Sequence, residues 1–266
     1  MVGPGPNPLQ AVGIVYSILF LVVAVLLWRA GRFTRPARYL LLAVTVFLGF
    51  AIFSPMLPHQ FQELVARSGT HIGANLVGGA FGIALVVLLT FLSGRHFCGY
   101  LCPVGAVQEL AYLAPVPKLR TCRIRELGVV RGIVFVIVIG AGLGAGVSVL
   151  SVFGIAEFFR LTLSAGFLAF VAVLACSLFF YRPFCRLFCP LGALFQVAAV
   201  PGLWKLRRTS ACISCGRCER ACPTGEAGPA ASKGECYLCR RCIEACPVEG
   251  AIVYGGASPG EVREPE

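Results

Sequence analysis

The residues most able to do chemistry are eight cysteines between positions 212 and 246. They form two sets with one pattern, C-x2-C-x2-C-x3-C-P. Three closely spaced cysteines, then a fourth and a proline, are typical of bacterial proteins with two iron–sulfur clusters, in which the fourth cysteine binds the other cluster. The spacing predicts one [4Fe–4S] cluster on Cys212, Cys215, Cys218 and Cys246, and a second on Cys236, Cys239, Cys242 and Cys222.

Two other cysteine chemistries fit this spacing less well. Disulfides are disfavoured because the topology argued below places the segment in the reducing cytoplasm. Structural zinc sites usually lack the third close cysteine and the trailing proline. Residues 209–254 resemble the bacterial two-cluster ferredoxins, with every ligand position filled by cysteine. The resemblance implies a small α+β ferredoxin domain there, followed by a flexible tail at 255–266.

Four further cysteines lie in a duplicated motif, R-x-F-C-x-x-x-C-P-x-G-A. Its copies begin at Arg95 and Arg182, an offset of 87 residues, and contain Cys98, Cys102, Cys185 and Cys189. Proline after the second cysteine predicts a helix with that cysteine at its N-cap, where a thiol pKa is lowered. The four thiols could hold a metal or cluster, form a redox-active pair, or serve only as small packing residues. The repetition of cysteine itself favours a redox or metal role.

The elements that carry these motifs are predicted to be membrane helices. Of the 266 residues, 58% are hydrophobic and only 13% are charged, against about 25% charged residues in soluble domains. This composition excludes an ordinary soluble enzyme and a disordered chain. A bilayer core of about 30 Å needs roughly 20 apolar residues per helix. Runs free of charge predict five transmembrane helices, at about 9–29, 39–57, 71–93, 128–150 and 161–181.

Arginine placement orients these helices. Arg29 to Arg38, Arg95 to Arg131, and the residues from Arg182 onward fall on one side of the membrane, and only Arg67 and Arg160 fall on the other. The positive-inside rule places the rich side in the cytoplasm. We therefore expect a bacterial or archaeal cytoplasmic membrane, an N-terminus outside and the ferredoxin domain in the cytoplasm. The net charge of +11 follows this topology, so nucleic acid is not an expected partner.

The 87-residue offset also carries the second predicted helix onto the fourth and the third onto the fifth. The fold class is therefore an all-α membrane protein with an internal repeat of two hairpins, plus the small ferredoxin domain. The expected parts are a first helix and loop at 1–37, hairpins at 38–120 and 121–208, the ferredoxin domain at 209–254 and the tail at 255–266. Parallel repeats often place a site where the halves meet.

This order of parts resembles the ferredoxin-type 4Fe-4S membrane proteins. The resemblance covers about 38–254, and its specific segments are 95–106, 182–193 and 212–247. The nearest type by layout is the quinol dehydrogenase component of periplasmic nitrate reductase systems. Related types are the nitrous oxide reductase regulators, which add an extracytoplasmic flavin domain, and the copper-reducing accessory proteins of cytochrome oxidase, which add a C-terminal domain. The resemblance implies electron transfer between the quinone pool and protein redox partners, as a subunit of a quinol dehydrogenase-type complex.

Two alternatives remain open: a membrane copper reductase or maturation factor, and a redox-sensing regulator of respiration. The histidines His59, His71 and His96 lie near predicted helix ends, so no b-haem is expected. A quinone headgroup could contact polar residues near the outer face, although an interfacial helix end explains them better; these are His71, Asn75, Glu63 and Glu157. Cys176 is interpreted as a packing residue and Cys122 as a spare thiol.

Overall fold

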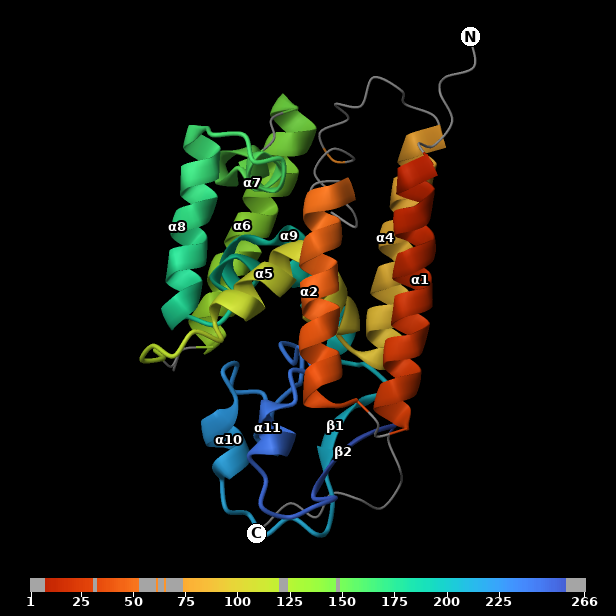
Figure 1. Cartoon of the computed structure of the whole chain (residues 1–266), viewed down its shortest axis with the longest axis vertical. Coiled ribbons are helices and arrows are strands. Elements are labelled where there is room, and N and C mark those ends of the chain that lie inside the picture. The colour runs from red at the N-terminus through yellow and green to blue at the C-terminus, as the bar shows by residue number, and fades with distance from the viewer. Residues whose placement is uncertain are drawn as a thin grey trace.

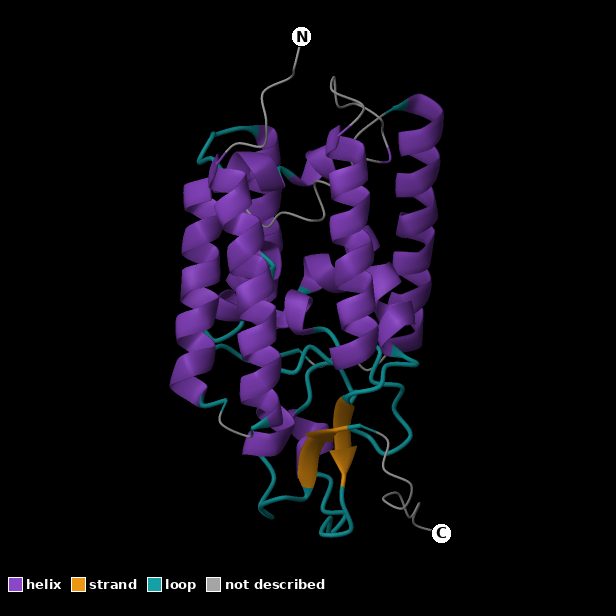
Figure 2. Cartoon of the chain, turned by 90° about the vertical axis from the view of Figure 1, so that its right-hand side faces the viewer, coloured by secondary structure: helices purple, strands orange, loops and turns teal. Residues whose placement is uncertain are grey.

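Five long helices run side by side in the computed structural model, which describes residues 8–30, 33–52, 61, 65, 74–119, 124–146 and 149–256 (Figures 1 and 2). They are α1 (Pro8–Arg29), α2 (Arg35–Ile52), α4 (Ala74–Ser93), α6 (Ile124–Ala145) and α8 (Ala165–Phe179). The mostly helical fold is therefore confirmed. The helices lie within a few residues of the predicted ranges; α6 begins at Ile124 rather than near 128, and α8 begins after Ser164, whose side chain caps the Phe167 N–H. His59, Glu63, His71 and Cys122 lie outside the described residues.

Two short helical segments lie between the long helices, and each has the same two parts. The first consists of the π-helical turn η1 (Phe97–Leu101) and helix α5 (Pro103–Ala111), and the second of η3 (Phe184–Phe188) and α9 (Pro190–Ala199). Both pairs of starting residues differ by 87, which matches the offset of the sequence repeat. Helix α5 packs against α2 and α8, whereas α9 packs against α6 and α4. Each short helix therefore contacts one long helix of its own repeat and one of the other repeat.

A tight turn joins the two long helices of the second hairpin at the end of the bundle opposite the C-terminal segment (Figure 1). Here η2 (Val149–Phe153) and α7 (Ile155–Phe159) join α6 to α8. Gly154 has φ 55°, and a Cβ at this position would lie 1.9 Å from the carbonyl carbon of Gly166. Only glycine fits both the left-handed backbone and the close approach. Glu157 lies half-buried in α7.

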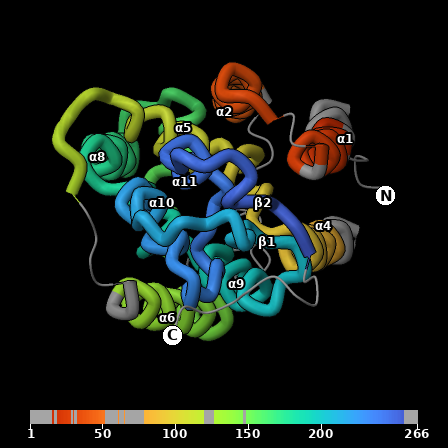
Figure 3. Tube along the Cα trace, turned by 90° about the horizontal axis from the view of Figure 1, so that it is seen from below, coloured from red at the N-terminus to blue at the C-terminus, as the bar shows by residue number. Residues whose placement is uncertain are grey.

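The C-terminal segment forms a small α+β unit with two short strands. It contains β1 (Lys205–Arg208), α10 (Arg217–Ala221), α11 (Arg241–Glu244) and β2 (Ile252–Gly255). The strands are antiparallel, with Lys205 opposite Gly255 and Arg208 opposite Ile252. This pairing extends the unit four residues ahead of the expected start at 209. Figure 3 shows the unit lying beneath one end of the helical bundle.

Specific contacts fix the unit to the helix ends. The Tyr254 hydroxyl donates to the Ser93 carbonyl at 2.6 Å, and its ring lies 5.5 Å from that of Trp28. Arg38, near the start of α2, donates to the Cys239 carbonyl and forms an ion pair with Glu244. The end of α1, the start of α2 and the end of α4 therefore all meet the C-terminal unit.

The described residues contain one helix segment that is long and apolar enough to cross a membrane, Leu127–Ala145 in α6. Shorter apolar segments occur at Leu19–Trp28, Gly79–Ser93, Ala165–Phe179 and Pro190–Ala199. Helix length and composition alone therefore do not show that all five predicted helices cross a membrane.

Candidate metal centres

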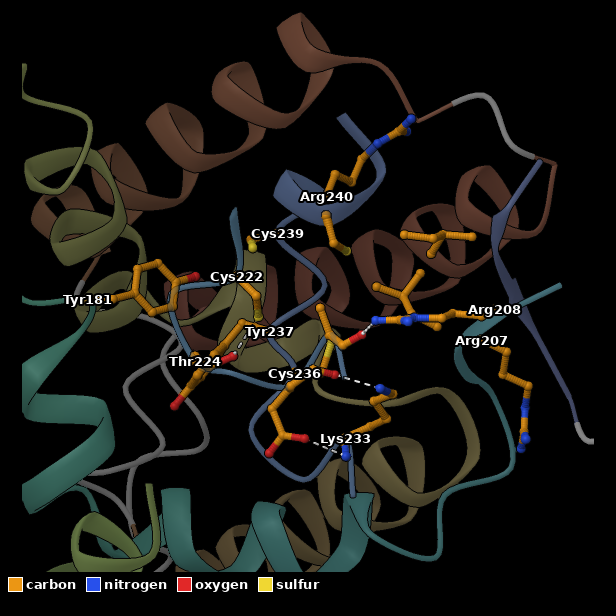
Figure 4. Close-up of a pocket in the computed structure, with 15 residues that line it drawn as sticks. Tyr181, Arg207, Arg208, Cys222, Thr224, Lys233, Cys236, Tyr237, Cys239 and Arg240 are labelled. Carbon is orange, nitrogen blue, oxygen red and sulfur yellow. Dashed lines mark hydrogen bonds between the residues drawn. The ribbon is translucent and has the colours of Figure 1, made fainter. Parts of the chain in front are cut away.

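Four of the predicted cluster ligands line one cavity in the C-terminal unit. Its volume is about 530 Å³, and Cys222, Cys236, Cys239 and Cys242 all contribute to its wall (Figure 4). These are the cysteines that the spacing assigns to the second cluster. Cys222 comes from the first cysteine set and the other three from the second, so the fold brings the two sets together in the way that the two-cluster pattern requires. We call this cavity the tail site; its ligand assignment stays a prediction.

The loop that carries three of these cysteines is shaped to hold anionic sulfur. Leu238 and Arg240 have φ values of 55° and 63°, so the chain turns sharply twice between Cys236 and Cys242. The backbone N–H groups of Leu238, Arg241 and Ile243 donate to the sulfurs of Cys236, Cys239 and Cys242. Such bonds stabilise thiolates and tune the potential of a bound cluster.

Burial opposes free thiolate in the tail site. It raises the pKa of Cys236 to about 12. A thiol with such a pKa is protonated and unreactive near neutral pH, and it loses its proton when a metal binds. The tail site is therefore poorly suited to nucleophilic chemistry.

The cysteines assigned to the other cluster lie further out. Cys218 is buried, whereas Cys215 is exposed. Arg208 donates to the Cys218 sulfur at 3.4 Å and forms an ion pair with Glu219 at 2.6 Å. Helix α10, which contains Cys218, packs against α11, and Cys246 follows α11. The structure thus places this set toward the outer surface of the unit, and its assignment also stays a prediction.

The duplicated motif forms a second four-cysteine cavity, here called the inner site. Cys98, Cys102, Cys185 and Cys189 line a cavity of about 350 Å³. Apolar side chains complete its wall: Phe97, Val104, Phe184, Leu191 and Phe195. The structure therefore unites two motifs that lie 87 residues apart in the sequence.

The two halves of the inner site have the same local geometry. Cys102 has φ −76° and ψ 116°, and Cys189 has φ −76° and ψ 113°. Both cysteines are N-caps with proline at the first helical turn, as the sequence predicts. The expectation of a lowered thiol pKa is wrong, however. Burial raises the pKa of both Cys102 and Cys189, which outweighs the backbone N–H of Gly105 or Gly192 donated to each sulfur.

Two arginines of the motif lie buried beside the inner site and join it to its surroundings. The Arg95 guanidinium lies 3.9 Å from the Cys98 sulfur and donates to the carbonyls of Gly192 and Gly234. Arg182 donates to the carbonyls of Cys98 and Gly99. Arg95 thus reaches from the first repeat to the second, and Arg182 reaches from the second to the first.

Buried acids near these arginines were missed by the sequence analysis. Glu109 forms ion pairs with Arg182 at 3.0 Å and Arg241 at 2.7 Å. Burial alone would raise the pKa of Glu109, but the two guanidinium groups lower it to about 2, so it remains a carboxylate. Glu235 likewise pairs with Arg131 at 2.6 Å and Arg186 at 3.0 Å.

Gln108 was also missed, and it contacts a site sulfur directly. Its side-chain nitrogen lies 3.4 Å from the Cys185 sulfur, and its oxygen accepts the Phe184 N–H at 3.0 Å. The available signal was a polar pair, Gln108 and Glu109, inside an otherwise apolar segment. Polar groups in such a segment are often functional.

Tyr237 lies between the inner site and the tail site. It lines the tail cavity, and its ring is covered by the guanidinium groups of Arg95 at 4.4 Å and Arg182 at 4.9 Å. The Tyr237 carbonyl lies 2.6 Å from where a Cβ on Gly99 would stand. Gly99 is therefore required for the close approach of the loop from Cys236 to Cys242, here called the tail loop, to the first motif.

Within the described part of the chain, no group of three or more His, Cys, Asp or Glu side chains is placed to hold one ion. This finding applies to the tail site as well. In a [4Fe–4S] cluster each thiolate binds a different iron, so the sulfurs stand further apart than they do around one ion.

Comparison with known proteins agrees with the cysteine patterns. A family described as "4Fe-4S binding domain" matches residues 75–122 and 162–209, which contain the two inner-site motifs. A second family with the same description matches residues 208–225. The chain carries 4Fe–4S ferredoxin-type domains. No solved structure matches the chain.

Several curated proteins are similar to this one. The putative electron transport protein YccM of Escherichia coli is 29% identical over 172 residues, which cover 58% of this chain and 47% of YccM. Protein NirI of Paracoccus denitrificans is 30% identical, with 83% and 36% covered. Regulatory protein NosR of Pseudomonas aeruginosa is 29% identical, with 79% and 33% covered. The chain spans less than two thirds of the length of each of these relatives. They agree with the family resemblance found in the sequence.

Neither Cys176 nor His96, two other residues singled out in the sequence, lines either cavity. Cys176 is exposed on α8 rather than packed within the fold, so the packing interpretation is wrong for the chain by itself. His96 is buried, its ring nitrogen lies 3.2 Å from the Tyr254 hydroxyl, and burial lowers its pKa to about 3, which keeps it neutral. The side chain of Asn75 lies outside the described residues.

Proposed function

We propose that this protein is a membrane-bound iron–sulfur electron-transfer protein that passes electrons between quinol and a respiratory redox partner. The observation that carries the proposal is the tail site, whose four cysteines line one cavity of the C-terminal unit. That unit lies beneath the helical bundle (Figure 1). A cluster fixed there would lie at a membrane surface, where electrons from a lipid-soluble donor could be passed to a soluble acceptor. The similar protein YccM is named for electron transport.

Exposed apolar side chains support a membrane location for the five long helices. Each helix displays large hydrophobic residues on its outer surface, with 52–69% of their area exposed: Leu19 and Leu26, Leu40 and Phe47, Phe81 and Leu88, Val136 and Leu143, and Leu168. Soluble proteins rarely expose continuous apolar surface of this kind. Lipid would cover it.

Helix direction supports the topology expected from the arginines. The ends of α1 and α4 and the start of α2 contact the C-terminal unit. Arg131 near the start of α6 pairs with Glu235, and the Tyr181 ring just after α8 lies 5.9 Å from that of Tyr237. The five helices therefore alternate in direction. With the arginine-rich ends in the cytoplasm, the ferredoxin unit lies inside and the start of α1 lies outside.

Anaerobic reduction of the purified protein by a quinol analogue tests this proposal. Each quinol releases two electrons and two protons as it becomes quinone, and two clusters each accept one electron. We expect the visible absorption of the oxidised clusters to bleach and reduced-cluster EPR signals to appear. Reduction by dithionite but by no quinol, with Cu(II) then reoxidising the clusters, would overturn the proposal in favour of a metal reductase.

A regulatory role is the second candidate, because the similar protein NosR is named a regulatory protein. A strain with cysteine-to-serine changes at the tail site separates the two roles. Loss of respiratory electron flux with unchanged gene expression supports electron transfer. Altered expression with unchanged flux supports regulation.

A further inference from the structure

We propose that Cys98, Cys102, Cys185 and Cys189 together bind one [4Fe–4S] cluster, a third centre in addition to the two predicted in the C-terminal unit. The four thiols line a single cavity between the two repeats. The inference deepens the proposed electron relay, but it concerns metal content and holds whichever donor feeds the relay.

Neither repeat supplies four ligands alone. Each stretch matched by the 4Fe-4S binding family contains three cysteines, two of them in the motif. The third cysteine of the second stretch, Cys176, is exposed on the outer surface of α8, and that of the first, Cys122, lies outside the described residues. Two motif cysteines from each repeat make the complete set of four that a [4Fe–4S] cluster needs.

The arrangement of the thiols favours a cluster over a single ion. No group of three cysteines in the described residues surrounds a point at which one ion could bind. The tail site, whose sequence spacing is that of a [4Fe–4S] cluster, likewise has four cysteines in the wall of one cavity. Both motifs also lie in segments that match a family described as "4Fe-4S binding domain". A zinc or copper thiolate site is the alternative outcome of the test below.

The buried positive charge beside the inner site favours the binding of an anion. The buried guanidinium of Arg95 lines the cavity, and the buried guanidinium of Arg182 donates to the carbonyls of Cys98 and Gly99. Arg182 is paired with the buried carboxylate of Glu109. Among the described residues, Arg95 has no carboxylate within ion-pair distance. The positive charge of Arg95 is thus left without an ion-pair partner, which is costly in a buried environment. An oxidised [4Fe–4S] cluster with its four thiolates carries about −2.

Hydrogen-bond donors also converge on the four sulfurs. The N–H groups of Gly105 and Gly192 donate to Cys102 and Cys189 at the first turns of α5 and α9. Gln108 donates to Cys185 and Arg95 to Cys98. Every sulfur of the inner site therefore has one donor. Donors of this kind stabilise cluster thiolates and set the reduction potential.

The position of the inner site makes it a partner for the tail site. Tyr237 lines the tail cavity and stacks on Arg95, which itself lines the inner cavity. One electron can pass from a reduced cluster in one site to an oxidised cluster in the other, and no proton need move. The relay would then reach from the helical bundle into the C-terminal unit.

Iron and sulfide analysis of the anaerobically purified full-length protein tests the inference. We expect about 12 irons and about 12 sulfides per chain, against about 8 of each if only the C-terminal unit binds clusters. Replacing all four inner cysteines with serine should remove about four irons and leave both C-terminal EPR signals. Replacing only Cys98 and Cys102 should remove the same amount, because one cluster spans both repeats. Cys176→Ser is the matched control and should lose none.

Three results would overturn the inference. The first is a content of about 8 irons in the unaltered protein, with both C-terminal signals at full intensity. The second is a stoichiometric zinc or copper ion that the inner-site variants lose. The third is that changing the cysteines of one repeat removes only half as much iron as changing those of both repeats. The first result needs no variant, so a variant that fails to fold leaves the test intact. Quinol oxidation is not measured, and failure of the proposed donor would therefore not affect the result.

Discussion

The tail site and the inner site use the same four-cysteine chemistry but specify it in different ways. The four tail-site cysteines lie within 21 residues, from Cys222 to Cys242, and sharp turns at Leu238 and Arg240 bring them around one cavity. The inner cysteines lie on two motifs 87 residues apart and meet only because α5 packs against α8 and α9 packs against α4. A motif with three close cysteines supplies three of the four ligands of its site, whereas each C-x3-C-P motif supplies only two.

The inner site also differs from the outer part of the C-terminal unit in how its surroundings are stabilised. The outer part of the C-terminal unit exposes Cys215, and its Arg208–Glu219 ion pair is partly exposed. The inner site is enclosed by ion pairs whose groups are almost fully buried, such as Arg182–Glu109. Disruption near the inner site should therefore cost more than disruption at the surface of the unit. The following predictions test that difference.

Loss of a tail-site ligand should have the largest effect. Cys239→Ser removes one of four thiolates, and the free energy of metal binding is then lost from folding. We expect loss of about four irons and of one EPR signal. Proteolysis of the C-terminal unit should be faster, because the loop that carries Cys239 loses the cluster that holds it. Retention of all iron after Cys239→Ser would remove this residue from the ligand set. Tyr39→Phe, which alters a neighbour of Arg38 and no ligand, is the control.

Neutralising Glu235 should cause the next largest effect. Glu235→Gln leaves Arg131 and Arg186 buried with no carboxylate between them. Removing one partner of a buried ion pair costs about 3–5 kcal/mol, and we expect a large fall in the Tm of the detergent-solubilised protein. Glu219→Gln removes the partly exposed pair with Arg208 and should cost about 0–1 kcal/mol. Equal Tm values for the two variants would show that the burial difference between the regions has no energetic consequence.

Enlarging Gly99 should have an intermediate effect. A Cβ at Gly99 would stand 2.6 Å from the Tyr237 carbonyl, so Gly99→Ala must push the tail loop away from the first motif. Overpacking of this kind typically costs about 1–3 kcal/mol. Gly82→Ala in α4 adds a Cβ that meets nothing within 4 Å. It should be neutral or stabilising by up to about 1 kcal/mol. Thermal unfolding in detergent measures both, and a Gly99→Ala variant as stable as Gly82→Ala would contradict the close docking.

Replacing Gln108 should have the smallest effect on the fold and a selective effect on the inner site. Gln108→Leu removes the donor to the Cys185 sulfur. Donors to sulfur stabilise the more negative, reduced cluster, so the midpoint potential of the inner centre should fall while those of the C-terminal centres stay constant. An EPR-monitored redox titration resolves the three centres. A change in midpoint potential confined to the C-terminal centres would contradict the assignment of Gln108 as a donor to the inner centre.

The sequence predicted much of the architecture because repeats and apolar runs are local signals. The 87-residue offset correctly related α2 to α6 and α4 to α8, and Pro103 and Pro190 correctly marked the starts of α5 and α9. The four-residue strand at Lys205–Arg208 was missed because its partner lies 47 residues later and its sequence is basic rather than alternating. Tertiary pairing alone makes it a strand.

The charged surroundings of the sites could not be predicted from spacing. Glu235 lies between two cysteine sets and looks like an ordinary loop acid, yet it joins Arg131 and Arg186 from the second repeat. The lowered pKa expected at the N-cap cysteines was wrong for a related reason. Helix N-termini are visible in the sequence, whereas the burial that raises the pKa of Cys102 appears only in the fold.

Quinol-driven reduction of the C-terminal clusters, compared between the unaltered protein and the variant with serine at Cys98, Cys102, Cys185 and Cys189, tests the central claim most directly. The claim is that electrons pass between the membrane and the C-terminal clusters by way of the inner site. Dithionite should produce both C-terminal EPR signals in each protein. A quinol analogue should produce them in the unaltered protein and fail to do so in the variant. Reduction of the variant by quinol at the unaltered rate would contradict the account.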